Sequence, residues 1–215
     1  TPLVSSVLMG AIPARIAGVA NRIMVTPPTR DGQVNPHLLA AAQACDIDAV
    51  YRVGSAWSIA ALAYGTASIP PVDVIVGPGN LFVTLAKKLV YGDVGIDGLQ
   101  GPTETLLVAD GTAQPTLVAA DLLAQAEHGV DSQVLLVSTS ARLGAAVVQE
   151  IETQLATLSR ADIARGALAN SRIVTVNSLD EAVAVSNQYA PEHLILQVAN
   201  PRPLLASIRN AGSVF

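Results

Sequence analysis

Patterns typical of β-strands and of α-helices alternate along this chain of 215 residues, with short connections between them. Runs rich in Val and Ile at residues 22–26, 49–53 and 72–76 each precede a segment of helix length. Parallel strands need a crossover connection, usually a helix, so repeated strand–helix units with short loops indicate parallel sheets with right-handed crossovers. The alternation therefore predicts an α/β fold.

The same alternation restarts near residue 100. Strands are expected at residues 105–109, 133–138, 172–176 and 193–198, and helices at residues 115–128, 140–158 and 201–212, with a further helix capped by residues 178–181. Helices that cover both faces of a parallel sheet give a doubly wound architecture. We predict an α/β fold of two Rossmann-like, doubly wound lobes with mainly parallel sheets, residues 1–99 and residues 100–215.

Composition narrows the classes of function. A net charge of −5 with only 12 Lys and Arg residues argues against a nucleic-acid surface, which needs a basic stripe. No apolar stretch reaches the length of a membrane span, and the first residues lack the layout of a signal peptide. The single cysteine, Cys45, cannot form an internal disulfide and is expected to be buried. We therefore expect a cytoplasmic protein with no nucleic-acid or membrane partner.

Four loops are candidates for function, because ligands of open parallel sheets bind beyond the carboxyl ends of the strands. They are residues 54–55, 77–80, 101–104 and 190–193. Residues 77–80, Gly-Pro-Gly-Asn, lie between an apolar strand and a helix, where glycines let a ligand approach the backbone and the helix N-terminus attracts an anion such as a pyrophosphate. The alternative is an ordinary strand-to-helix turn in which Asn80 is the N-cap.

Gln125 and His128 stand three residues apart at the end of an expected helix and share one face of it. An imidazole and an amide oxygen could form half of a metal site. Glutamine is an unusual zinc ligand, however, and a histidine at a helix end often caps carbonyl groups. Spacing alone favours the cap.

Glu192 and His193 are adjacent and precede an expected strand. A carboxylate beside an imidazole makes a general acid/base pair, since both groups can be tuned near neutral pH. The alternative is a turn whose polar side chains are solvated. Thr103 and Glu104 could lie beside a substrate or could simply form a turn that enters a strand.

Together these segments resemble the histidinol dehydrogenase family, and the resemblance spans the chain. The matching stretches are SSVLMGAIPARIAGV, IAALAYGT, VDVIVGPGNLFVTLAKK, GIDGLQGPTETLLVAD, DLLAQAEHGVDSQVLL and APEHL. The resemblance implies a zinc- and NAD-dependent oxidoreductase of histidine biosynthesis. Such enzymes oxidise L-histidinol to L-histidine with two NAD⁺, through a bound histidinaldehyde.

The resemblance also implies roles for particular residues. Gln125 and His128 match zinc ligands, and the zinc holds the imidazole and the amine of the substrate as an orienting Lewis acid. His193 matches the base that takes the hydroxyl proton in the alcohol step and contacts the substrate. Glu192 matches the residue that activates water for the aldehyde step. Thr103 matches a position that contacts the substrate, and Asn80 one that contacts NAD.

Some features depart from the family pattern. The family usually has glutamine, which contacts NAD, where Trp57 stands, although Trp57 could stack on the cofactor. It usually has alanine where Gln100 stands. The chain begins at Thr1 without methionine and ends at Phe215 before the remaining zinc ligands, an aspartate and a histidine. We therefore expect an internal fragment that lacks both natural termini and the NAD loop before Thr1, and that is inactive alone.

Two other functions stay open. One is a related dehydrogenase that oxidises another small polar alcohol in the same site. The other is a non-catalytic α/β module that binds a nucleotide or only dimerises. Retention of all four polar residues, Gln125, His128, Glu192 and His193, argues against a decayed site. The resemblance implies a homodimer in which each subunit completes the active site of the other.

Overall fold

The computed structural model describes residues 3–215 and divides the chain into two compact units, Thr1–Gly101 and Pro102–Phe215. Every strand pairing in this described range is parallel. The α/β class with mainly parallel sheets is therefore confirmed. The boundary falls two residues after the one expected, and the roles assigned to residues 1–99 and 100–215 stay predictions.

The first unit contains four helices and four short strands among its described residues. They are α1 (Val4–Ile16), β1 (Ile23–Val25), α2 (Pro36–Ala44), β2 (Ala49–Tyr51), α3 (Ser55–Tyr64), β3 (Val74–Ile75), α4 (Leu81–Val90) and β4 (Gly95–Ile96). Strand β1 pairs with β2, and β3 pairs with β4, in two separate sheets. Helices α3 and α4 pack together over a core that includes Ile59, Leu62, Ile75 and Val90.

The second unit is built on one five-stranded parallel sheet. Its elements are β5 (Glu104–Ala109), α5 (Pro115–Ala126), β6 (Gln133–Ser138), α6 (Ala141–Leu155), α7 (Ala161–Ala169), β7 (Arg172–Thr175), α8 (Leu179–Tyr189), β8 (His193–Gln197), a 3₁₀ helix η1 (Arg202–Ser207) and β9 (Ser213–Val214). The strand order is β7-β6-β5-β8-β9. The chain thus proceeds outward from β5 in one direction and then in the other, which is the strand order of a doubly wound sheet.

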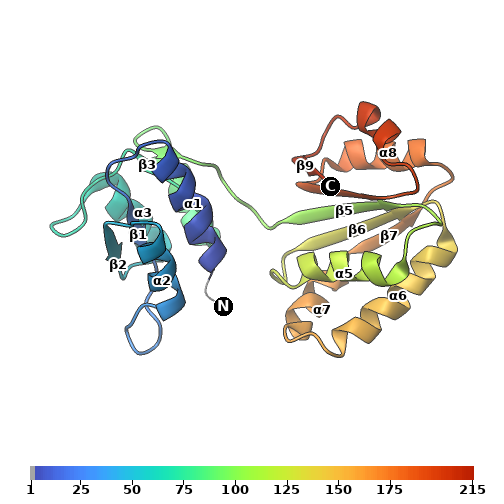
Figure 1. The fold of residues 1–215 in the computed structure, drawn as a ribbon, viewed down its shortest axis with the longest axis horizontal. Coiled ribbons are helices and arrows are strands. Elements are labelled where there is room, and N and C mark those ends of the chain that lie inside the picture. Colours follow the sequence, from blue (N-terminus) through green and yellow to red (C-terminus); the bar gives the residue numbers. More distant parts are fainter. Residues whose placement is uncertain (1–2) are drawn as a thin grey trace. The chain divides into compact units, whose positions relative to one another are not determined.

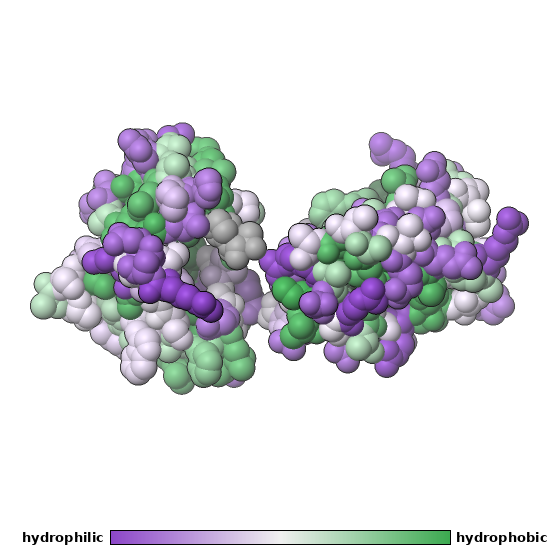
Figure 2. Space-filling view, turned by 90° about the horizontal axis from the view of Figure 1, so that it is seen from below, coloured by the Kyte–Doolittle hydropathy of each residue, from purple (hydrophilic) through white to green (hydrophobic). Residues whose placement is uncertain are grey.

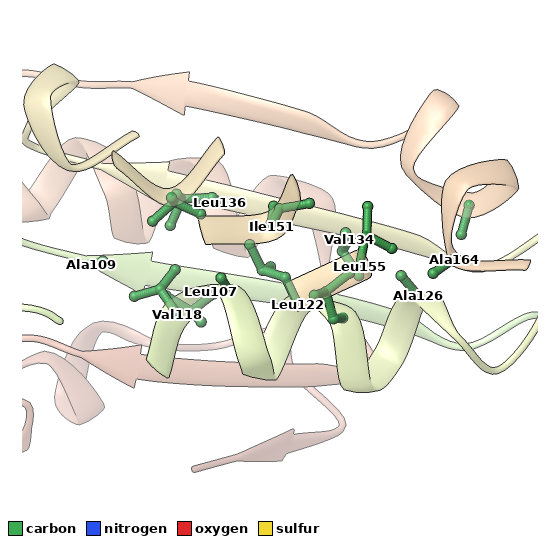
Figure 3. Packing of buried hydrophobic residues seen from close by; sticks show 14 of the residues in the cluster. Leu107, Ala109, Val118, Leu122, Ala126, Val134, Leu136, Ile151, Leu155 and Ala164 are labelled. Carbon is green, nitrogen blue, oxygen red and sulfur yellow. The ribbon is translucent and has the colours of Figure 1, made fainter. Parts of the chain in front are cut away.

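Helices cover both faces of this sheet (Figure 1). Helices α5, α6 and α7 lie on one face and α8 lies on the other. Along β5 the side chains alternate, as a period of two requires: Leu107 and Ala109 face α5, whereas Leu106 and Val108 face the side of α8. Figure 3 shows Leu107, Leu122 and the neighbouring apolar side chains filling the space between the sheet and α5. A strand that is buried on both faces needs an uninterrupted apolar run, and β5 has one.

Several local expectations are confirmed. Asn35 caps α2, where its Oδ1 accepts a hydrogen bond from the His37 amide at 2.9 Å, and Pro36 occupies the first turn. Ser178 caps α8 in the same way, by accepting from the amide of Glu181. Cys45 is buried and unpaired.

Two expected helices differ in the structure. The helix expected over residues 140–158 ends at Leu155, and a turn leads into α7, so that the apolar faces of both helices pack on the same core. The helix expected over residues 201–212 is only the short η1, followed by β9. The last residues instead pair with β8 as an edge strand, which satisfies their backbone hydrogen bonds.

Helix α4 is apolar on both faces. Val83 and Val90 face the core of the first unit, whereas a second set of apolar side chains is exposed: Leu81, Phe82, Leu85 and Leu89. Figure 2 shows apolar surface lying between polar patches. In the range 3–215, no helix is long and apolar enough to cross a membrane.

Candidate functional site

The five site residues that the sequence predicts in the second unit all belong to one edge of its sheet. Thr103 precedes β5, and Glu192 and His193 stand at the start of β8. Helix α5 connects the carboxyl end of β5 to the amino end of β6, so its last residues return to the amino edge as well. The site therefore lies at the amino ends of the strands. The expectation that residues 101–104 and 190–193 lie at the carboxyl edge is wrong, because both loops lead into a strand.

His193, Thr105 and Gln125 lie on the same face of this edge. Thr105 of β5 is the register partner of His193 on β8, and partners on parallel strands point to the same side. Ile195, two residues along from His193, packs in the core on the α5 side. On that side Thr105 contacts Gln125 of α5 through a hydrogen bond of 3.3 Å between Thr105 Oγ1 and Gln125 Oε1. An imidazole, a hydroxyl and an amide thus gather on one face.

The Gln125 amide is buried but only half satisfied. The residue is 7% exposed, and its Nε2 atom has no hydrogen-bond partner among the described residues. An unpaired buried polar group costs about 1–3 kcal/mol, so such a group suggests a ligand. The two amide atoms are nearly interchangeable in shape. With the amide turned over, Nε2 donates to the Thr105 hydroxyl and Oε1 is free to bind a metal ion.

His128 lies in the turn after α5 and is exposed, whereas Gln125, three residues earlier, is buried. Its Nδ1 lies 2.9 Å from the carbonyl oxygen of Ala124. A carbonyl only accepts, so Nδ1 is the donor, and in a neutral imidazole Nε2 is then the nitrogen with the free lone pair. This hydrogen bond is the carbonyl-capping role that the position of His128 at the helix end favours. It is also the arrangement of most metal-binding histidines, which donate their other ring N–H to a carbonyl or carboxylate.

These residues fit a zinc ion as two of its ligands. Imidazole nitrogen and amide oxygen are both suitable donors, and the unpartnered amide of Gln125 is the buried group that such an ion would satisfy. Across residues 3–215, no group of three or more His, Cys, Asp or Glu side chains could hold a metal ion.

The start of β8 is held in place by the end of the chain. Ala190, with a φ of 56°, ends α8 in the left-handed conformation. The carbonyl of Glu192 accepts from the Ser213 amide at 2.9 Å, and that of Pro191 accepts from the Gly212 amide at 3.0 Å. The Glu192 side chain is exposed, which leaves its carboxylate open to water and to a substrate.

Thr103 is half-buried in the turn before β5, and its carbonyl is tied to the amide of Gln133 on β6. Glu104 occupies the other face of the sheet, near Tyr189 of α8. Burial raises the pKa of Tyr189, and the charge of Glu104 raises it further. The Tyr189 hydroxyl donates to Gln133 Oε1 at 2.6 Å. Of the turn residues, Thr103 therefore stays the substrate-contact candidate, and Glu104 belongs to a structural cluster.

In the first unit, residues 77–80 follow β3 and enter α4, as expected. Asn80 is the N-cap of α4, where its Oδ1 accepts from the Val83 amide at 3.1 Å. Gly77 has a φ of 116°, a conformation that side chains rarely adopt. Trp57 lies in the first turn of α3 and is 77% exposed, so its indole is available to a planar ligand.

Three polar residues around these sites were not predicted from the sequence. Thr105 is buried inside an apolar strand, and nothing in its spacing marks it as a partner of Gln125. Lys87 and Asp97 form an ion pair beside the Gly77 loop. The available signal for Lys87 is its place on α4 four residues after Val83 and three before Val90, which puts it on the core-facing side.

Comparison with known proteins identifies relatives of this chain. The sequence model of the histidinol dehydrogenase family matches residues 1–215. The chain is 54% identical over 216 residues to the histidinol dehydrogenase of Desulfotalea psychrophila and 55% identical over 216 residues to that of Xanthomonas euvesicatoria pv. vesicatoria, covering all of this chain and 50% of each relative. The crystal structure of histidinol dehydrogenase from Elizabethkingia anophelis superposes with a TM-score of 0.96 at 45% identity, again over the whole chain and 50% of that protein.

The chain thus spans about half the length of the curated relatives it matches. The match runs without a gap in coverage through both units, including the loops that carry Asn80, Gln125, His128, Glu192 and His193. The chain belongs to the histidinol dehydrogenase family.

Proposed function

We propose that this chain is part of an enzyme that oxidises L-histidinol to L-histidine with zinc and two NAD⁺, through a bound histidinaldehyde. The observation that carries the proposal is the unpartnered, buried amide of Gln125, on the same face and edge of the sheet as His193. Membership of the family supports the substrate. By the same resemblance we propose a cytoplasmic homodimer with shared active sites.

Each catalytic side chain serves one half of the reaction. When bound, zinc supplies a Lewis acid that orients the substrate, and NAD⁺ supplies the hydride acceptor. His193 takes the proton of the substrate hydroxyl as the carbinol carbon loses its hydride, which yields the aldehyde. Glu192 then takes a proton from the water that adds to the aldehyde carbonyl, and loss of a second hydride yields the carboxylic acid. Gln125 and His128 would hold the zinc ion, which would place the substrate beside these groups, and Thr103 contacts the substrate.

The remaining roles belong to the first unit. We propose that residues 1–99 form the NAD-binding lobe, with Asn80 as a contact and Trp57 as a stacking surface for the cofactor, and that residues 100–215 form the catalytic lobe. The N-terminus of α4, which follows a glycine turn, supports this division, because the positive end of a helix dipole suits the negative charge of a pyrophosphate.

The experiment that tests the proposal is the yield of NADH per L-histidinol, measured at 340 nm with the full-length enzyme, zinc and excess NAD⁺. We expect a yield near two and tightly held zinc, which His128→Ala removes. Bound zinc without turnover of histidinol would favour a dehydrogenase for another small alcohol. Neither zinc nor turnover would favour a non-catalytic module.

Thr105→Val is expected to weaken zinc binding about 10- to 100-fold, as loss of a group that orients a metal ligand commonly does. Valine keeps the shape of threonine but cannot hydrogen-bond to the Gln125 amide, which then loses its fixed orientation. The measurement is zinc affinity by competition with a chromophoric chelator. Thr105→Ser is the matched control, because it keeps the hydroxyl. Equal zinc affinity in the valine and serine variants would contradict a positioning role for Thr105.

A further inference from the structure

Lys87 of α4 is buried in the first unit, with only 1% of its side chain exposed. Its ammonium group donates to three acceptors: the carbonyl oxygen of Gly77 at 3.1 Å, the Oε1 of Gln100 at 3.0 Å, and a carboxylate oxygen of Asp97. An ammonium has three N–H donors, so all of them are used. The lysine therefore acts inside the protein and is not available to bind a ligand itself.

Asp97 binds both the Lys87 ammonium and the backbone amide of Gly77. Its second carboxylate oxygen accepts from the Gly77 amide at 2.8 Å and from Gln100 Nε2 at 3.1 Å. Burial raises the pKa of Asp97, but hydrogen bonds from Lys87 and Gly77 outweigh that effect and leave the pKa below its ordinary value. Lys87 and Asp97 therefore hold the carbonyl and the amide of the same residue, Gly77.

Gly77 is the residue at which the chain turns from β3 towards α4. Its φ of 116° is open to glycine but strained for other residues, so hydrogen bonds on both sides select one of several conformations available to it. A second link supports the same geometry, since Thr84 Oγ1 of α4 donates to the Gln100 carbonyl at 2.9 Å. The loop at residues 97–100 and the turn at residues 77–80 are thus fastened together.

The choice of an ion pair here needs a reason beyond stability. Taking two charges out of water is costly, and well-packed apolar side chains often stabilise a core as well or better. Charged hydrogen bonds are directional, however, and these end on backbone atoms of the turn. Compared with apolar side chains in the same place, the ion pair additionally fixes the position of residues 77–80.

We propose that Lys87 and Asp97 are positioning residues that hold the Gly77–Asn80 turn in the conformation that binds NAD. This inference rests on the proposed function, in which Asn80 contacts the cofactor. Gln100, where the family pattern has alanine, adds a third member that bridges the lysine and the carboxylate. The departure at this position thus reinforces the arrangement without replacing any part of it.

The test is Lys87→Met in the full-length enzyme, with Lys88→Met as the matched control. Lys88 is the next residue on the same helix and is exposed, so the same substitution there leaves the turn untouched. We expect the Kd for NADH, measured by its fluorescence, to rise about tenfold or more in Lys87→Met. The KM for NAD⁺ should rise in parallel, while the KM for histidinol and the Kd of the control variant stay within about twofold.

Hydrogen exchange followed by mass spectrometry gives an independent readout. Peptides that cover residues 76–84 should exchange faster in Lys87→Met than in the control, and peptides from α3 should not. An unchanged Kd for NADH in a folded Lys87→Met protein would overturn the proposal, whether or not exchange in this peptide changes. If Lys87→Met fails to fold, Asp97→Asn serves in its place, because it keeps the size of the side chain. The same rise in Kd supports the proposal, and an unchanged Kd overturns it.

The unmodified enzyme separates this inference from the proposed function. If the unmodified enzyme binds no NADH, the proposed function fails, and the role of the turn in binding the cofactor fails as well. That conclusion holds even if Lys87→Met speeds hydrogen exchange at residues 76–84. If the unmodified enzyme binds NADH and produces two NADH per histidinol, an unchanged Kd in the folded variants overturns the positioning role alone.

Discussion

Glu192→Gln is expected to stop the reaction after its first half, so that about one NADH forms per active site in a single turnover instead of two. Glutamine keeps the size of glutamate but cannot take a proton from water, and loss of a general base typically costs about 10²–10⁴-fold in rate. Overall turnover should fall by that factor, while oxidation of the alcohol to the aldehyde continues. Stopped-flow absorbance at 340 nm measures both phases.

His193→Asn should give the reverse pattern. The variant loses the base for the alcohol step, so it should oxidise supplied histidinaldehyde but not histidinol. The two effects can be separated because His193 is fixed within β8 beside Thr105, whereas Glu192 lies before the strand with an exposed side chain. Equal losses with both substrates in both variants would contradict the division of roles.

Glu127→Gln is the matched control for the glutamate. Glu127 lies next to His128, at the same edge of the sheet, and its backbone amide closes the last turn of α5. The substitution removes the same charge as Glu192→Gln, but from the end of α5. If Glu127→Gln lowered the second phase as much as Glu192→Gln, the effect would come from the local charge and not from proton transfer.

The architecture of the second unit could be predicted well from the sequence. Strands β5 and β6 are buried on both faces, so they appear as apolar runs of strand length, and the helices between them follow with their caps. The strand at the edge of the sheet was harder to predict. Strand β9 is two residues long and exists because its backbone pairs with β8, so local sequence favours the helix that was expected there.

The place of the candidate site could be predicted only in part. The roles of Gln125, His128, Glu192 and His193 stay predictions, and the loops at residues 101–104 and 190–193 lie at the amino edge of the sheet, not at the expected carboxyl edge, because both enter a strand. Thr105 was missed because its partner on α5 depends on how the helix packs. Lys87 was missed because α4 is apolar on both faces, so the sequence does not show which face of the helix is buried, nor that Lys87 lies on it.

Gly212→Ala is expected to disturb the active site from outside it. A Cβ atom at Gly212 would lie 2.6 Å from the carbonyl oxygen of Glu192, a distance that Cβ contacts essentially never show. The contacted oxygen belongs to the backbone, so no side-chain rotation can relieve the clash. The backbone hydrogen bonds that hold Pro191 and Glu192 must therefore shift. Overpacking of this kind typically costs about 1–3 kcal/mol of stability, and a misplacement near 1 Å can cost about 10²-fold in rate. We expect a lower urea midpoint and a weakened second phase of NADH formation.

Gly111→Ala provides the comparison for this effect. Gly111 follows β5 in the same unit, and a Cβ there would meet only the Ser140 Cβ at 3.9 Å, an ordinary contact. Its variant should keep the urea midpoint and both kinetic phases. Because Gly212 touches Glu192 through backbone alone, a selective loss of the second phase in Gly212→Ala would show that the edge strand β9 sets the position of the carboxylate. Normal kinetics in a folded Gly212→Ala protein would show instead that the start of β8 can move without consequence, and that the catalytic role of Glu192 does not depend on its backbone position.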